Sequence, residues 1–174
     1  INHKQHVIDT LRENTDFVIL AHPKLFNAYT PADMSRLGRY HAVEVLNHFR
    51  FSFELWDAAL SAGRPVWGFA GDDSHDVTVS GETGVCWTVI YAKSKKRRHI
   101  VNAILQGNHY MVSGRRGKLL NRLKSLEIKN NRIQVSFDLP AEKLRFIGQD
   151  GKIRKELAYV DSAELELLPA DTYI

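Results

Sequence analysis

Three short apolar segments of the sequence stop on polar residues that can bind metals or contact a substrate. The stops are at His22, Asn47 and Asp72, and each lies 25 residues after the one before it. This spacing is typical of strand–helix units in a parallel sheet, which collect their functional residues at the carboxyl ends of the strands. We therefore predict a functional site at one edge of a parallel α/β sheet.

The residues after the third segment have the composition of a metal site. Asp73 and His75 place a carboxylate and an imidazole two residues apart, and such donors suit Zn, Mn or Fe. The alternative is a turn in which Asp72 or Asp73 binds the backbone. His22, in Ala-His-Pro, could likewise belong to a simple turn. A parallel sheet would bring His22 and Asp73-Ser74-His75 to the same end, which favours a metal site.

Glu44 lies within the second apolar segment and needs an explanation, because a buried unpaired carboxylate is costly. Either it points into a polar site, or it forms an ion pair, for example with Arg39. Asn47 and His48 could contact a ligand or begin the helix that follows.

The composition of the 174-residue chain, 44% apolar and 25% charged, is that of a globular protein of one domain or two small ones. No apolar run reaches 18 residues, so we expect no membrane span.

The net charge of +4 is concentrated near Lys95 and Arg115. Polyanion binding is one explanation and a solvated helix start and loop is the commoner one; a basic rim would also suit a phosphate-bearing substrate. The aromatic residues are spread as in a core, which argues against nucleic acid as a partner. The single cysteine, Cys86, is expected in the core.

The pattern of apolar and polar residues changes near residues 114–117. Before this point, apolar runs and helical periodicity alternate, and after it period-two alternation with tight turns predicts antiparallel hairpins. We therefore predict an α/β part over residues 1–116 and a small β-sandwich-like domain over 117–174. The predicted strands are 17–21, 42–46, 66–70 and 87–92, then 126–128, 133–137, 144–147 and 163–167; the predicted helices are 3–13, a short one from 31, one from Phe49 to Leu60, and 95–106.

The ordered motifs resemble those of the PHP family, metal-dependent phosphoesterases named for polymerase and histidinol phosphatase. The resemblance covers nearly the whole chain, and its motifs are Val18-Ile19-Leu20-Ala21-His22-Pro23, Tyr40 to Asn47, Trp56 to Leu60 with Gly63-Arg64, Gly71 to His75, Trp87 to Ala92, Ala103 to Gly107 with Tyr110, Phe146-Ile147-Gly148 and Asp150-Gly151-Lys152. It implies a distorted, TIM-like (β/α)7 barrel with up to three divalent metals.

By motif match, the resemblance implies that His22, Asp73 and His75 bind metal and that Glu44 and Asn47 line the cleft, with no ligand role given to Glu44. Arg115 and Arg116 could meet the substrate. The family's first His-x-His motif is absent, as are the Glu and His ligands that follow it. The expected fold is therefore a partial (β/α)7 barrel, made of its later strands, followed by a small antiparallel β domain.

The function that the resemblance implies is hydrolysis of a phosphate ester by metal-activated water, with Zn, Mn or Fe as cofactor and a small phosphorylated molecule as substrate. We expect the chain alone to be weakly active or inactive. An open barrel edge would favour self-association or a missing N-terminal segment. The alternative is a non-catalytic ligand-binding or interaction module on a degenerate PHP scaffold. Localisation cannot be read, because any targeting segment would lie upstream.

Overall fold

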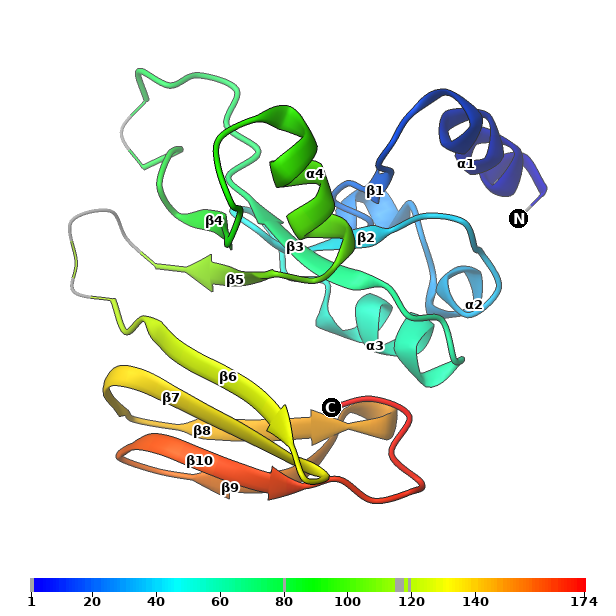
Figure 1. Ribbon diagram of the computed structural model, residues 1–174. Helices are drawn as coiled ribbons and strands as arrows, with labels where there is room; N and C mark the ends of the chain where they lie inside the picture. Colours follow the sequence, from blue (N-terminus) through cyan, green and yellow to red (C-terminus); the bar gives the residue numbers. More distant parts are fainter. Residues whose placement is uncertain (1, 80, 115–117, 119) are drawn as a thin grey trace. The chain divides into compact units, whose positions relative to one another are not determined.

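The computed structural model describes residues 2–79, 81–114, 118 and 120–174. The chain divides into two compact units, Ile1–Gly117 and Lys118–Ile174. Figure 1 shows the elements of each unit, coloured along the sequence.

A short parallel sheet lies at the centre of the first unit. Its strands are β1 (Ile19–Leu20), β2 (Ala42–Asn47) and β3 (Trp67–Gly71), in the order β1-β2-β3. Ile19 pairs with Ala42, and Asn47 pairs with Gly71, both in parallel register. The carboxyl ends of all three strands therefore lie at the same edge. The connecting helices are η1 (Leu25–Asn27) and α2 (Pro31–Met34) between β1 and β2, and α3 (Phe53–Ser61) between β2 and β3.

The expected partial (β/α)7 barrel is wrong, because the parallel arrangement stops after these three strands. The next strand, β4 (Cys86–Ile90), pairs antiparallel with β5 (His109–Ser113) in a separate two-stranded sheet. Helix α4 (Arg97–Leu105) connects them and is followed by Gly107, whose φ of 73° is typical of a helix end. β5 is thus antiparallel to β4 where a barrel needs another parallel strand (Figure 1). All other sheets in the described part of the chain are antiparallel, so the fold is small and β-rich.

The core of the first unit is formed by side chains of β2, α2 and α3. Val43 and Val45 are fully buried, as are Met34 and Leu37 from α2 and the segment after it. α2 begins with a capping box in which the side chains of Thr30 and Asp33 each bind the other residue's backbone N–H. α3 contributes Leu55 and Ala59 to the same core. None of the helices in the described ranges is both long and apolar enough to cross a membrane.

The second unit consists of antiparallel strands. β6 (Leu123–Lys129), β7 (Arg132–Ala141) and β10 (Val160–Glu166) form a sheet in the order β10-β7-β6. Asn130 and Asn131 connect β6 to β7 with φ values of 50° and 62°, the left-handed geometry of a two-residue hairpin. A second hairpin joins β8 (Leu144–Gly148) to β9 (Lys152–Leu157) through η2 (Gln149–Gly151). Both hairpins expected from the sequence are present.

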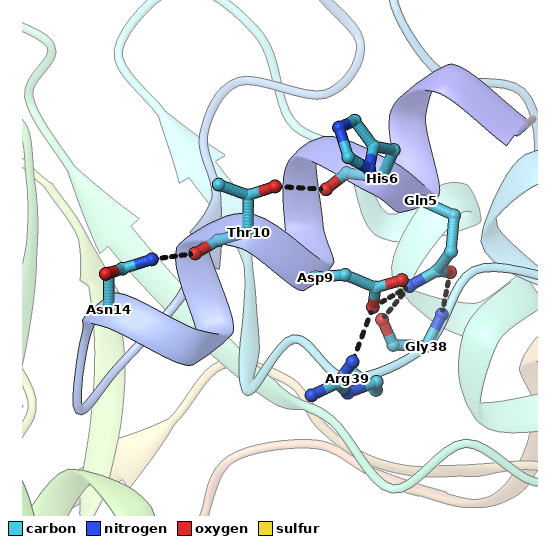
Figure 2. Close-up of polar contacts among 7 residues, drawn as sticks. All are labelled: Gln5, His6, Asp9, Thr10, Asn14, Gly38 and Arg39. Carbon is cyan, nitrogen blue, oxygen red and sulfur yellow. Dashed lines mark hydrogen bonds and ion pairs between the residues drawn. The ribbon is translucent and has the colours of Figure 1, made fainter.

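Helix α1 (Asn2–Asn14) is fixed to the segment before β2 by side chains of one face. Gln5 makes two reciprocal hydrogen bonds with the backbone of Gly38, and Asp9 forms an ion pair with Arg39 at 3.1 Å. Figure 2 shows these contacts and, on the same helix, the bond that Thr10 donates to the carbonyl of His6. Ile8, 2% exposed, anchors the helix in the core.

Replacing Gln5 should loosen this attachment. Gln5→Ala removes both bonds to Gly38, and we expect the free energy of unfolding to fall by about 1–2 kcal/mol. Urea unfolding followed by tryptophan fluorescence measures this, because all three tryptophans lie in the first unit. Thr10→Ala is the control: it removes a bond within α1 at an exposed position, and a change within about 0.5 kcal/mol is expected. Equal effects of the two substitutions would contradict the attachment through Gln5.

Candidate functional site

Glu44 turns toward the carboxyl ends of the parallel strands. Its Oε2 accepts hydrogen bonds from the backbone N–H of His22 at 2.5 Å and from Nδ2 of Asn47 at 3.2 Å. Glycine at position 71 leaves the room that this requires, because a Cβ there would lie 2.9 Å from Oε1 of Glu44. Arg39, the alternative partner, pairs with Asp9 instead. Of the two explanations for Glu44, the geometry favours the polar site.

Asn47 connects two carboxylates. The residue is 2% exposed, and its Nδ2 donates to Oε2 of Glu44 and to Oδ2 of Asp73, both at 3.2 Å. Its Oδ1 accepts from the backbone N–H of Phe49 at 2.9 Å. All hydrogen-bonding groups of the amide are thereby used to hold the ends of β2 and β3 together. We call Glu44, Asn47 and Asp73 the carboxylate cluster.

The two neighbouring aspartates after β3 have different tasks. Asp73, with φ of 53°, faces Asn47, whereas Asp72 accepts hydrogen bonds from three consecutive backbone N–H groups, those of Gly84, Val85 and Cys86, at 2.6 to 2.8 Å. Burial raises the pKa of Asp72, but these three bonds outweigh it and place the pKa below its ordinary value. Asp72 therefore closes the loop that carries Asp73 and His75.

The two predicted histidine ligands differ in burial and in their contacts. His22 is half-buried with φ of 29°, and its backbone N–H is bound to Glu44. His75 is exposed, and its ring lies 6.4 Å from the ring of Phe49. Within the described ranges, no three His, Cys, Asp or Glu side chains stand close enough together to hold a metal ion. The ligand roles of His22, Asp73 and His75 remain a prediction.

A small cavity adjoins the cluster and contains residues that the sequence reasoning missed. Its volume is about 10 Å³, room for about one water-sized sphere. His22 and Asn47 belong to its lining, together with Lys24, Leu25, Phe49, Arg50 and Ser52. The missed polar residues are Lys24, Arg50 and Ser52. Ser52 followed by Glu54 is a common pattern at the start of a helix and could have indicated Ser52. The helical periodicity from Phe49 instead predicted an earlier start. The predicted substrate residues Arg115 and Arg116 lie outside the described residues.

Comparisons with protein families, with curated proteins and with solved structures yield no match to this chain. The resemblance to the PHP family thus stays a prediction from the motifs of the sequence.

Proposed function

We propose that the carboxylate cluster belongs to the site of a metal-dependent phosphoesterase, as the resemblance to the PHP family implies, acting on a small phosphorylated substrate. The observation that carries the proposal is the bridge of Asn47 between Glu44 and Asp73 at the ends of parallel strands. No lysine or arginine of the described part pairs with either carboxylate. Two carboxylates sharing one neutral amide lack the positive charge that usually compensates them, and a divalent cation would supply it.

The donors near the cluster fall short of a complete metal site. Carboxylate oxygens from Glu44 and Asp73 and the imidazoles of His22 and His75 are suitable in kind for Zn, Mn or Fe. Three of them do not meet at one point in the described part of the chain. We therefore assign no reaction step to a metal, and the proposal concerns only which residues contribute to its binding.

Metal titration of the purified chain tests the proposal. We expect Mn²⁺ or Zn²⁺ to bind, with an affinity that falls at least tenfold in Asp73→Asn, because one charged donor is lost. Isothermal titration calorimetry measures the affinity, and hydrolysis of p-nitrophenyl phosphate is expected to be weak in the chain alone. Asp76→Asn, an exposed position in the same loop, is the control and should bind metal like the unchanged chain. Metal affinity that is the same in Asp73→Asn would contradict the proposal.

The second candidate is a non-catalytic ligand-binding or interaction module. It is favoured by the absence, among the residues described, of three donors that meet at one point. Its expected result is that neither Mn²⁺ nor Zn²⁺ binds at any pH where the chain is folded. The same titration therefore separates the two candidates.

A further inference from the structure

Residues of the loop between β2 and α3 line the cavity beside the carboxylate cluster, and hydrogen bonds hold this loop in place. After β2, the backbone N–H of Phe49 binds Oδ1 of Asn47, and the backbone N–H of Ser52 binds the carbonyl of Val45 at 2.8 Å. Leu46 and Phe51 also pair as an antiparallel bridge. This loop places Ser52 directly before α3. The hydrogen bond of its backbone N–H fixes where the Ser52 side chain lies.

The hydroxyl of Ser52 is buried without a partner. Ser52 is 1% exposed, lines the cavity, and its Oγ has no hydrogen bond within the described part of the chain. It occupies the N-cap position of the nine-residue helix α3 but does not cap it. A buried unpaired hydroxyl is costly, and the first turn of a helix carries partial positive charge. Both features are satisfied by a negatively charged oxygen in the cavity.

Positive side chains line the same cavity. Arg50 makes no ion pair within the described residues, and Lys24 pairs with Glu54 in the first turn of α3 at 2.5 Å. The hydrogen bond from Lys24 lowers the pKa of Glu54 below its ordinary value. Lys24 is thus already paired with a carboxylate of the chain, and an anionic ligand would compete with Glu54 for it.

We propose that this cavity is a phosphoryl-binding subsite. One phosphoryl oxygen enters the cavity and accepts a hydrogen bond from Oγ of Ser52, while the outer oxygens face Arg50 and Lys24. The volume of about 10 Å³ admits one oxygen and not a whole phosphate group. The inference rests on the proposed function for its substrate class, and the shared lining residues His22 and Asn47 would place the phosphoryl group beside the carboxylate cluster.

Titration with inorganic phosphate in the presence of EDTA, at constant ionic strength, tests this subsite without any metal. Amide chemical shifts of the first turn of α3 should change on binding. Ser52→Ala and Arg50→Ala should each weaken phosphate binding about tenfold, because each removes a hydrogen bond or ion pair to a charged group. Glu54→Gln should strengthen it, because the competing carboxylate is gone. Arg36→Ala, which removes an exposed arginine away from the cavity, is the matched control and should leave the affinity unchanged.

Stability without phosphate distinguishes a binding role from a structural one. Because the hydroxyl of Ser52 has no partner, Ser52→Ala should melt at the same temperature as the unchanged chain or higher, while losing most of the stabilisation by phosphate. A lower melting temperature would show that a tightly held water or a chain group satisfies the hydroxyl, and would overturn the proposal. Phosphate binding that is absent, or equal in Ser52→Ala and the unchanged chain, would also overturn it. Asp73→Asn should retain phosphate affinity in EDTA, so failure of the metal proposal and failure of this subsite give different results.

Discussion

Asn47→Asp should be the most damaging substitution in the carboxylate cluster, lowering the free energy of unfolding by about 3–5 kcal/mol at neutral pH. The change replaces the bridging amide with a third carboxylate between Glu44 and Asp73. At 2% exposure, water cannot readily screen the repulsion or replace the lost bonds. Urea unfolding by tryptophan fluorescence measures the loss.

Two further variants separate the effect of the added charge from the effect of losing the hydrogen bonds of the amide. Asn47→Ala removes the same hydrogen bonds without adding charge, and about 2–3 kcal/mol is expected. Asn102→Asp adds a carboxylate at an exposed position of α4 and should change stability by about 0.5 kcal/mol or less. On acidification, the introduced carboxyl group gains a proton and becomes a donor again, so the deficit of Asn47→Asp should shrink. A deficit no larger than that of Asn47→Ala would mean that the two carboxylates are already compensated by a bound cation.

The sequence predicted the strand ends well because their signals are local. Apolar runs bounded by polar residues locate β2 and β3 to within a residue, and the polar residues within or directly after these runs include Glu44, Asn47 and Asp73. The direction of the later strands is not local. Gly63 after α3 and Gly107 after α4 have nearly the same φ, 75° and 73°, yet a parallel strand follows the first and an antiparallel strand the second, so this reversal is decided by tertiary packing. The motif order resembled that of a barrel, but it carries no information on this reversal.

At the start of α3, a hydrogen bond to a side chain competes with helix formation, and the periodicity of the sequence does not show this. Phe49, Phe53, Trp56 and Leu60 follow a helical pattern, which predicted one buried face beginning at Phe49. In the structure, the Asn47 side chain captures the N–H of Phe49 in a turn, and the helix begins four residues later. Phe49 and Phe53 are consequently 53% and 52% exposed, and Leu55 and Ala59 face the core. The shift also creates the buried position of Ser52.

Asp72→Asn should lower the free energy of unfolding by about 2–3 kcal/mol. The carboxylate accepts from Gly84 through one oxygen and from Val85 and Cys86 through the other. An amide keeps only one acceptor oxygen, so at least one backbone N–H would face an N–H group. These donors lie 12 to 14 residues away, so the substitution should open the loop that carries Asp73 and His75.

The pH dependence of this loss has a defined sign. Because the pKa of Asp72 is lowered in the folded state, its contribution is complete above the ordinary pKa of 3.8 and disappears as the pH falls through the folded value. The stability difference between the unchanged chain and Asp72→Asn should therefore be constant from pH 7 to about pH 5 and narrow below about pH 4. Asp76→Asn is the matched control, because the one oxygen of Asp76 that binds Thr78 can be retained by an amide, and no measurable change is expected. Amide hydrogen exchange of Gly84, Val85 and Cys86 should accelerate in Asp72→Asn alone; unchanged protection at these three positions would show that Asp72 does not hold the loop.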